Sequence, residues 1–251
     1  MDELVSIIMP SYNTGRYIAE TINSVLQQTW KNWELLIVDD CSTDETVQVV
    51  ESYKDSRIHL FVNEQNSGAA MSRNRALREA KGKWIAFLDS DDLWMPEKLE
   101  CQIEFMKKND CSFSYTSYCE IDEASQPLGK TVTGPKKITH SGEKCYCWQG
   151  CLTVMYDRDK IGTVQIADLK KHNDYAMWLQ LSKEADCYLL KEVLAEYRRR
   201  KASISSVGYK ELIRHFYVLW RRGEGLGVVG AVLHTGLNIG FGLIKKILYV
   251  R

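Results

Sequence analysis

The chain has little of what marks several common classes of protein. Its 33 lysines and arginines balance its 33 aspartates and glutamates, so no excess of positive charge indicates a nucleic-acid partner. The first twenty residues lack the succession of basic, apolar and small residues that forms a secretory signal, which predicts a cytoplasmic protein. Eight cysteines in 251 residues are too sparse for a disulfide scaffold, and the cytoplasm would keep them reduced.

Two nucleotide-binding signatures and one metal-binding signature are also absent. No G-x-G-x-x-G follows the first apolar run and no G-x4-G-K-S/T occurs anywhere, which argues against a dinucleotide oxidoreductase and a P-loop phosphotransferase. Cys145, Cys147 and Cys151, with His140 nearby, lack the paired C-x2-C spacing of structural zinc sites. We therefore expect these cysteines to be ordinary half-buried thiols. Since the glycine-rich motifs are missing, we expect any nucleotide to be held through carboxylates and a metal ion.

Apolar runs alternate with helical patterns in the first part of the chain. The predicted strands cover residues 5–9, 34–38, 58–62 and 84–88. The predicted helices between them cover residues 18–28, 47–53 and 69–80. Near-continuous apolar strands that alternate with helices indicate a parallel sheet covered on both faces. We therefore predict an α/β fold built on a single Rossmann-like, mostly parallel sheet flanked by helices.

A polar motif follows each of the four predicted strands. Residues 12–13 follow the first strand, 39–40 the second, 63–75 the third and 89–92 the fourth. Open α/β sheets bind ligands beyond the carboxyl ends of their strands. The sequence thus predicts that four loops converge on one ligand site at one edge of the sheet.

Three carboxylates crowd into the last of these loops. Asp89, Asp91 and Asp92 would repel one another and lose hydration unless a cation or hydrogen-bond donors surround them. Mg²⁺ or Mn²⁺, held by one or two carboxylates and by a substrate's phosphates, meets that need. We also expect Asp92 to cap a helix that follows it, but capping does not explain Asp89 and Asp91.

In this order, the motifs resemble those of the inverting family 2 glycosyltransferases, which have the GT-A fold and use nucleotide-sugar donors. The resemblance runs from about residue 5 to residue 205. It rests on a P-x-Y-N element at 10–13, a helix at 21–29, a V-D-D-x-S-x-D-x-T segment at 38–46, N-x-G and A-R-N elements at 66–68 and 72–74, and a D-x-D signature at 89–91. Each motif is ordinary alone, but their joint occurrence at strand ends is highly specific.

The resemblance implies a role for each matched residue. Tyr12 lies near the donor base, Asp40 contacts the base, and Arg73 approaches the donor. Asp89 and Asp91 bind the ribose and, through the metal, the diphosphate. Asp91 is the main metal ligand, and the register of the acidic run leaves Asp89 and Asp92 as further metal ligands. The other residues that the matched motifs place at the nucleotide-sugar are Pro10, Asn13, Asp39, Asn66, Gly68 and Ser90.

The second half of the chain supplies candidates for a catalytic base. Inverting displacement at an anomeric carbon needs a base that deprotonates the acceptor hydroxyl. Residues 170–179 resemble the family's E-D-x-x-x-W-L segment, and the resemblance makes Asp174 the base. The residues alone leave a helix N-cap role for Asp174 equally open, and His172 is the second candidate base. Asn173 replaces the family's glutamate, so any role of that carboxylate is absent or met by another group.

Two further segments are assigned around the acceptor. Residues 197–205 resemble a Y-R-x-H-x-x-S-x-S stretch, with Arg200 where many relatives carry histidine. Charged arginine cannot ligate a metal but neutralises a diphosphate, which puts a third protein ligand for the metal in doubt. The segment is predicted to order as a lid over the donor, with a solvated basic loop as the alternative. Residues 149–156 have strand character and are predicted to wall the acceptor side.

The C-terminal segment, residues 207–251, carries seven lysines and arginines against two glutamates, and its middle is apolar. Residues 226–244 are about long enough to span a bilayer, but five glycines with His234 and Asn238 weaken that interpretation. An interfacial helix on the anionic cytoplasmic leaflet explains the pattern better. The alternative is a helical hairpin packed on the catalytic domain or on a second copy in a homodimer.

These features predict a catalytic GT-A domain at residues 1–206, with a nucleotide-sugar-binding half at 1–95 and an acceptor-binding half at 96–206. Residues 207–251 form a helical, membrane-associating appendage. The predicted activity is metal-dependent, inverting transfer of one sugar from a nucleotide-diphosphate sugar, such as a UDP-sugar, to a glycan or lipid-linked saccharide in bacterial surface polysaccharide synthesis. We expect the enzyme to act peripherally at the inner face of the cell membrane.

Two other functions stay open. Processive synthases carry a Q-x-x-R-W element and several membrane spans, and the lack of both favours transfer of one sugar per encounter. Asn173 and Arg200 suggest a noncatalytic sugar-nucleotide-binding or scaffold subunit as the alternative. A nucleotidyltransferase is the third hypothesis, against which the lack of a glycine-rich, lysine-bearing loop after the first strand counts.

Overall fold

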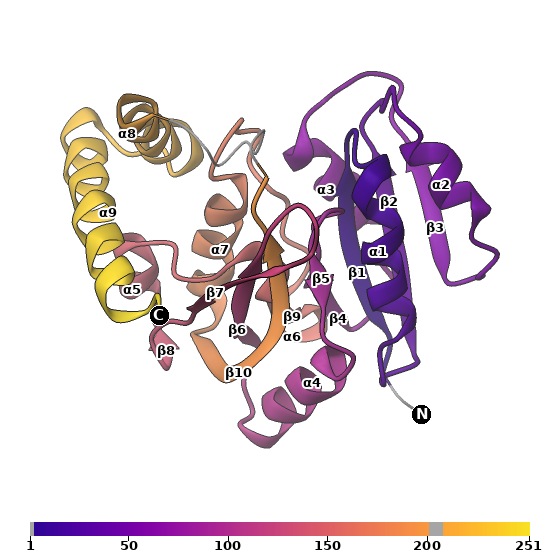
Figure 1. The fold of residues 1–251 in the computed structure, drawn as a ribbon. Coiled ribbons are helices and arrows are strands. Elements are labelled where there is room, and N and C mark those ends of the chain that lie inside the picture. Colours follow the sequence, from indigo (N-terminus) through magenta and orange to yellow (C-terminus); the bar gives the residue numbers. More distant parts are fainter. Residues whose placement is uncertain (1–2, 201–207) are drawn as a thin grey trace.

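The computed structural model describes residues 3–200 and 208–251, and arranges them as one sheet between layers of helices (Figure 1). The strands are β1 (Val5–Ser11), β2 (Trp33–Asp39), β3 (Ile58–Val62), β4 (Trp84–Phe87), β5 (Leu93–Trp94), β6 (Phe113–Ile121), β7 (Pro127–Val132), β8 (Lys137–Ile138), β9 (Met155–Asp157) and β10 (Cys187–Arg198). The helices are α1 (Gly15–Leu26), α2 (Thr46–Ser52), α3 (Ala69–Glu79), α4 (Lys98–Lys108), α5 (His140–Cys145), α6 (Arg158–Ile161), α7 (Asn173–Glu184), α8 (Tyr209–Val218) and α9 (Val228–Leu248). A 3₁₀ turn, η1 (Cys151–Thr153), and a π-helical turn, η2 (Leu219–Gly223), complete the elements.

The sheet order explains where a ligand site forms. Along its main path the order is β3-β2-β1-β4-β9-β6-β10-β5. β1 pairs in parallel with both β2 and β4, so the connection reverses direction between β1 and β4. Such a switch point leaves a crevice at the carboxyl ends of the two strands. The prediction of a single sheet flanked by helices is confirmed, although antiparallel pairing begins where β9 joins β4 and β6.

β1, β2 and β4 are buried along their whole length because helices cover both faces of the sheet there, whereas β3 at the edge is partly exposed. Successive side chains of a strand point to opposite faces. Ile7 of β1 packs in the same core as Ile18 of α1, whereas its neighbour Ile8 packs with Leu77 of α3 on the other face. This two-sided burial is the reason that the sequence shows continuous apolar runs rather than alternation.

The prediction of a strand over residues 149–156 is wrong for most of its length. The Thr153 amide and hydroxyl both donate to the Gly150 carbonyl, at 2.9 and 2.7 Å. That local pairing winds residues 151–153 into η1, and strand pairing begins only at Met155 in β9. A hydroxyl that bonds nearby backbone competes with an extended conformation in this way.

The C-terminal segment packs on the rest of the chain as a helical hairpin. Phe216, Trp220 and Ala231 share a core with Tyr175 and Leu179 of α7. After α9 the chain pairs with β7: Thr131 and Arg251 exchange two backbone hydrogen bonds of 2.7 and 2.9 Å. The predicted C-terminal helical segment is confirmed, and its inner face packs beside α5 and α7, as Figure 1 shows on the left.

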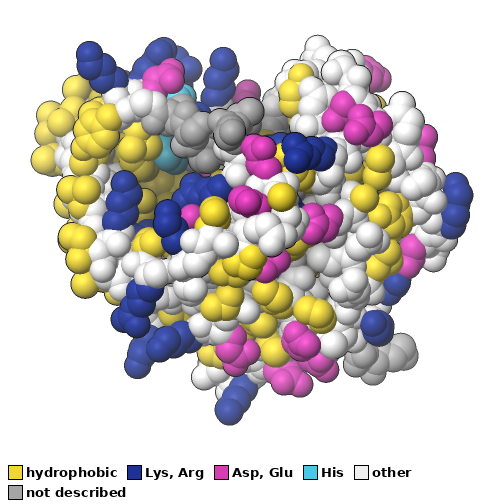
Figure 2. Space-filling model, viewed as in Figure 1, with side chains coloured by type: hydrophobic (Ala, Val, Ile, Leu, Met, Phe, Trp, Pro, Cys, Tyr) yellow, Lys and Arg dark blue, Asp and Glu magenta, His cyan; other side chains and the backbone are white. Residues whose placement is uncertain are grey.

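The outer face of α9 exposes a row of apolar side chains, which we call the α9 ridge. Its members are Val228, Val229, Val232, Leu233, Leu237, Leu243, Ile244, Ile247 and Leu248. In the space-filling view, apolar side chains gather along the left edge of the molecule, with lysines and arginines above and below them (Figure 2). By length and composition, α9 is the one helix among the described residues that could cross a membrane.

Candidate active site

The loops that follow β1, β2, β3 and β4 meet at one edge of the sheet, as expected. The Asp40 amide donates to the Ser11 carbonyl at 2.8 Å, which joins the loops after β1 and β2. The Thr14 hydroxyl donates to the Ser90 hydroxyl at 3.0 Å across the switch point between β1 and β4. Parallel strands thus deliver their polar ends to a common crevice.

Asp40 lies where the loop after β2 meets the loop between β3 and α3. Its Oδ1 accepts from the Ser67 amide at 2.9 Å and from Asn63 Nδ2 at 2.8 Å, and its Oδ2 accepts from the Gly68 amide at 2.7 Å. Gly68 begins α3 with φ of +84°, a conformation that a side chain would strain, so glycine suits this position. A carboxylate oxygen accepts about two hydrogen bonds, which leaves Oδ2 one acceptor position for a ligand.

Other residues predicted to bind the nucleotide-sugar frame Asp40. Asp39 is buried and accepts from the Ser42 amide and hydroxyl, so it shapes the loop after β2. Asn13 accepts from the Thr43 amide at 2.8 Å and ties that loop to β1. Tyr12 is exposed beside them, where its ring is free to stack on a planar group. The remaining two predicted residues are Pro10, which is buried within β1, and Asn66, whose Nδ2 donates to the Asp40 carbonyl at 3.1 Å.

Arg73 joins the loop after β4 to the start of α7. It is almost fully buried on α3; one guanidinium nitrogen pairs with Asp89, and the other donates to Asn173 Oδ1 at 2.9 Å. Burial acts against its charge, but Asp89 and Asp174 outweigh that cost and raise the pKa of Arg73. Asn173 is uncharged, so the direct charged contact here is the one between Arg73 and Asp89.

The acidic loop after β4 places its three carboxylates differently. Asp89 and Asp91 keep 31% and 15% of their side chains exposed, whereas Asp92 is buried. Asp92 Oδ1 accepts from the Arg198 amide at 2.8 Å. The expected helix cap is wrong: residues 93–94 form β5, and α4 begins only at Lys98, so Asp92 anchors the end of β10 instead.

The exposed part of the acidic loop suits a divalent cation. Among the residues that the structure describes, no three histidine, cysteine or acidic side chains are gathered as a ready metal cage. Asp89 and Asp91 nevertheless offer hard oxygen donors at the switch point, and Mg²⁺ or Mn²⁺ needs only one or two carboxylates when phosphates complete its shell. Burial raises the pKa of Asp91, Arg200 opposes this shift, and Asp89 adds to it. Arg73 and Arg200 pair with these two carboxylates, so a cation that binds here has to compete with them.

Arg200 lies at the same loop. Its Nε is 2.7 Å from Asp91 Oδ2, and its guanidinium carbon is 5.5 Å from the centre of the Tyr17 ring. Residues 201–205, which complete the stretch predicted to form a lid, lie outside the described residues.

Asp174 is half-buried in the first turn of α7, next to Asn173. The N-cap position of this helix is His172, in a left-handed conformation with φ of +57°, so the alternative of Asp174 as the N-cap is wrong. The His172 ring stacks on Phe216, with 4.3 Å between ring centres. Burial is the main cause that lowers the pKa of His172 to about 4, which leaves the ring neutral at pH 7.

Sequence reasoning missed a buried polar cluster below Asp174, between α5 and α9. Lys245 Nζ donates to the Trp148 carbonyl at 2.6 Å, and Asn238 Nδ2 donates to the Cys145 carbonyl at 2.8 Å. Glu143 accepts from Gln149 at 2.8 Å and is fully buried. Asn238 and Lys245 are seven residues apart in α9, so they lie on the same face of the helix. This spacing could have indicated from the sequence that one face of α9 is polar and packs on the rest of the chain.

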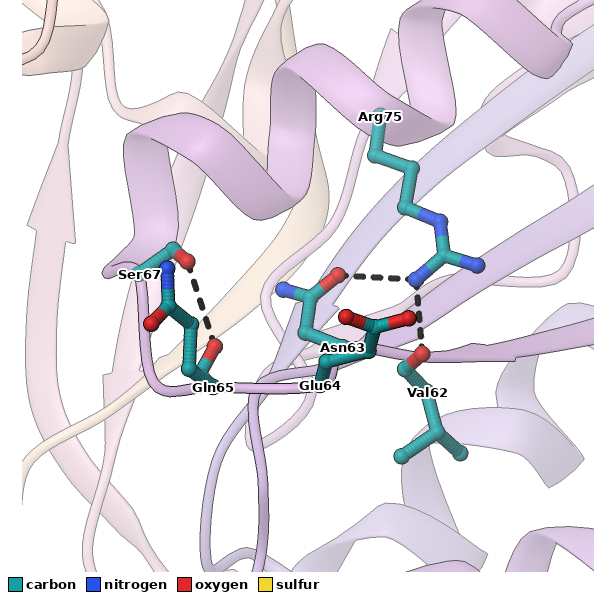
Figure 3. Close-up of a pocket in the computed structure, with 6 residues that line it drawn as sticks. All are labelled: Val62, Asn63, Glu64, Gln65, Ser67 and Arg75. Carbon is teal, nitrogen blue, oxygen red and sulfur yellow. Dashed lines mark hydrogen bonds between the residues drawn. The ribbon is translucent and has the colours of Figure 1, made fainter.

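Arg198 and Asn63 were also missed as individual site residues. Arg198 belongs to the matched Y-R element, and its Nε donates to the Asp91 carbonyl at 2.7 Å. Asn63 separates Asp40 from an open pocket of about 540 Å³ at the end of β3. Figure 3 shows the residues that line this pocket: Val62, Asn63, Glu64, Gln65, Ser67 and Arg75. Arg75 closes one side by donating to Asn63 Oδ1 at 2.9 Å.

A mixed α/β sheet with acidic residues after the strand at its switch point is typical of GT-A-type transferases. The chain belongs to glycosyl transferase family 2, whose family model matches residues 6–149.

Relatives of similar length are named as glycosyltransferases. TuaG of Bacillus subtilis, named for teichuronic acid biosynthesis, is 44% identical over 218 residues, which cover 86% of each chain. WfgD of Escherichia coli, named as a UDP-Glc:alpha-D-GlcNAc-diphosphoundecaprenol beta-1,3-glucosyltransferase, is 46% identical over 220 residues, which cover 87% of this chain and 86% of WfgD. The predicted enzyme class, a glycosyltransferase, is confirmed.

Solved structures share the fold. TarS residues 1–349 of Staphylococcus aureus, in complex with UDP-GlcNAc, superpose with a TM-score of 0.73 at 22% identity, over 98% of this chain and 76% of that chain. The mannosyltransferase PcManGT of Pyrobaculum calidifontis, in complex with GDP-Man and Mn²⁺, superposes with a TM-score of 0.69 at 17% identity, over 98% of this chain and 74% of that chain. The predicted GT-A fold is confirmed.

Proposed function

We propose that this protein is a metal-dependent, inverting glycosyltransferase that moves one sugar from a UDP-sugar to a hydroxyl of a lipid-linked saccharide. The single observation that carries the proposal is the contact of Arg73 with both Asp89 and Asn173. It joins the acidic end of β4, on the donor side, to the helix turn that bears Asp174. Group transfer requires that the donor and the catalytic base be held in fixed relative positions. Arg73 would connect the two, since it contacts Asp89 on the donor side and Asn173 beside the base.

The donor would lie along the switch-point crevice. Asp40 keeps one acceptor position for the base N–H, and Tyr12 offers a ring for stacking. Arg73 and Arg200 supply positive charge toward the diphosphate. Asp91 and Asp89 would hold Mn²⁺ or Mg²⁺, and we assign Asp92 the structural contact with Arg198. When bound, such a metal neutralises charge on the departing diphosphate.

The base would be Asp174. It is half-buried and adjacent to the Arg73 contact, which orients the turn that carries it. Direct attack of the acceptor hydroxyl at the anomeric carbon, with its proton passing to this carboxylate, inverts the configuration. His172 packs its ring against Phe216, so we assign it a structural role.

The acceptor class follows from the relatives and from the α9 ridge. WfgD is named for transfer to a diphosphoundecaprenol-linked sugar, and TuaG for teichuronic acid biosynthesis. A lipid-linked acceptor brings the enzyme to the membrane, where we infer a cytoplasmic, peripheral location in bacterial surface polysaccharide synthesis. The helix cannot cross the bilayer while Asn238 and Lys245 hold it to the acceptor half, so it would lie in the interface.

The enzyme assay uses purified protein, a panel of sugar nucleotides with and without Mn²⁺, and a synthetic lipid-diphosphate-linked GlcNAc. We expect transfer from one UDP-sugar that depends on Mn²⁺. Asp174→Asn should abolish transfer with little loss of UDP binding, and the control Asp186→Asn, at a residue that pairs with Lys137, should change neither. Equal loss of binding and transfer in Asp174→Asn would contradict the role of base. Metal-dependent donor binding without turnover on any acceptor would favour the scaffold alternative.

Membrane contact is tested by sedimentation with vesicles that contain anionic lipid. Leu233 and Ile247 are 63% and 77% exposed, and burying such a side chain fully is worth roughly 2 kcal/mol. Inserting both therefore gains about 3 kcal/mol, or roughly a hundredfold in partitioning. Leu233→Ser/Ile247→Ser should lose that factor, and Leu128→Ser, at an exposed residue of β7, should not. Light scattering that shows a dimer in wild type, broken by the double substitution without any vesicle binding, would assign the ridge to a second copy.

A further inference from the structure

Three consecutive arginines stand at and just after the end of β10, and each forms an ion pair with a different carboxylate: Arg198 with Glu20, Arg199 with Glu120 and Arg200 with Asp91. Arg198 is buried, and its Nε donates to the main-chain carbonyl of Asp91. Arg199 pairs with Glu120 at 2.5 Å. Arg200 places its Nε 2.7 Å from Asp91 Oδ2. Of these three, Arg200 is the one whose side chain contacts a carboxylate predicted to bind metal.

Arg200 is able to change partners without disturbing the core. Its side chain keeps 26% of its surface exposed and covers the Tyr17 ring, whereas the Arg198 side chain has no exposed surface. Asp91 is likewise held on its main-chain side by Arg198, so its position does not depend on Arg200. A rotation of one side chain is therefore enough to expose the Asp91 carboxylate.

A guanidinium and a divalent cation compete for the same carboxylate. Mg²⁺ and related ions bind carboxylate oxygens at about 2.1 Å, and a positive guanidinium at hydrogen-bond distance repels them. A nucleotide diphosphate changes this balance, since it supplies phosphate oxygens to the metal and a planar, doubly accepting partner to arginine.

We propose that Arg200 is the counter-ion of Asp91 when no metal is bound. The metal displaces Arg200 from Asp91, and the diphosphate of the donor then becomes the new partner of Arg200. The inference rests on the proposed function of this site. It predicts an order of binding: metal alone binds weakly because it must displace Arg200, whereas metal and nucleotide together bind well because Arg200 gains a new partner.

The decisive property is that removing the charge of Arg200 has opposite effects on two affinities. Partly exposed ion pairs contribute up to about 1 kcal/mol, so Arg200→Gln should tighten Mn²⁺ binding without nucleotide by about fivefold. The same variant should weaken UDP binding at saturating Mn²⁺ because the diphosphate loses an arginine. Arg200→Lys keeps a positive charge and should leave Mn²⁺ binding near that of wild type. Arg199→Gln, at the neighbouring arginine that pairs with Glu120, is the matched control and should change neither affinity.

The experiment measures Mn²⁺ bound to the full chain by electron paramagnetic resonance of free Mn²⁺, with and without UDP, at fixed pH and low ionic strength. Thermal melting checks that every variant folds, and Asp91→Asn reports whether Mn²⁺ binds at this loop. Tighter Mn²⁺ binding in Arg200→Gln together with weaker UDP binding supports the proposal. If Asp91→Asn lowers Mn²⁺ affinity but Arg200→Gln leaves it unchanged or lower, the metal site stands and the counter-ion role is refuted. If no variant binds Mn²⁺ even with UDP, the proposed metal-dependent function fails with it.

Discussion

Replacing Glu143 by glutamine should stabilise the protein, and the gain should grow with pH. Glu143 on α5 is fully buried and has no hydrogen-bond partner within the described structure for its Oε1. Burial raises the pKa of Glu143 from 4.5 to about 8, although Gln149 and Lys245 favour the charged form. The carboxyl is therefore protonated in the folded protein across much of the range in which the unfolded chain has already ionised.

The magnitude follows from this difference in pKa. The pKa of Glu143 is higher in the folded protein than in the unfolded chain. The stabilising contribution of the protonated Glu143 is therefore complete below about pH 4.5 and is lost as pH rises toward about 8. The loss is about 1.4 kcal/mol per pH unit, which amounts to roughly 3 kcal/mol at pH 7. Glutamine mimics the protonated acid and removes this loss. Its amide also offers a donor to Gln149 Oε1, another buried oxygen without a hydrogen-bond partner in the described part of the chain.

Urea unfolding at pH 5, 6, 7 and 8 tests the reasoning. The free energy of unfolding of Glu143→Gln should exceed that of wild type by a margin that increases with each pH unit up to about pH 8. Glu184→Gln, at an exposed position of α7, is the control and should follow wild type. A gain that does not vary with pH would assign the effect to packing, and a loss of stability at pH 7 would refute the account of a buried, uncompensated acid.

Three other predictions concern the site. His172→Phe should keep the stacking on Phe216 and remove a loss of stability in acid. Because the pKa of His172 is lowered to about 4, the free energy of unfolding of wild type falls by up to about 3 kcal/mol as pH falls from about 6.5 to about 4. Thermal melts across that pH range measure the difference. Asn173→Asp should place a second negative charge on Arg73 and weaken UDP binding severalfold in calorimetry; unchanged affinity would show that Arg73 does not sense the diphosphate. Gly68→Ala should cost about 2 kcal/mol of stability and weaken UDP binding, because its backbone conformation, which places the amide on Asp40, is one that a side chain strains; a variant with wild-type melting would contradict the strain.

The fold of the first 95 residues was predictable because its signals are local. Each of β1 to β4 is a short apolar run followed at once by its polar motif, so one sequence window contains both the strand and the residues that it delivers. The switch point between β1 and β4 then follows from general rules of α/β sheets. Asp40 and Arg73 were placed in the crevice on that ground.

The rest of the chain was less predictable because its contacts join distant parts of the sequence. β10 is partly exposed and pairs with β6, so it carries no continuous apolar run. Asp92 looked like a helix cap because its carboxylate precedes a helix, but its partner is the Arg198 amide at the far end of β10. Glu143 meets the Lys245 region only when α9 folds back on α5. Such pairings depend on the tertiary fold, which no local window contains.

Continuity of the sheet limits how this enzyme can move. β4 belongs to the first 95 residues, and it is hydrogen-bonded to β9, which in turn pairs with β6; both of these strands lie in residues 96–206. A hinge between these two parts of the chain would have to break the hydrogen bonds between the strands, so the parts cannot close on each other as rigid bodies. The sheet therefore keeps the two parts in fixed relative positions. Adjustment during turnover is left to side chains and loops at its edge.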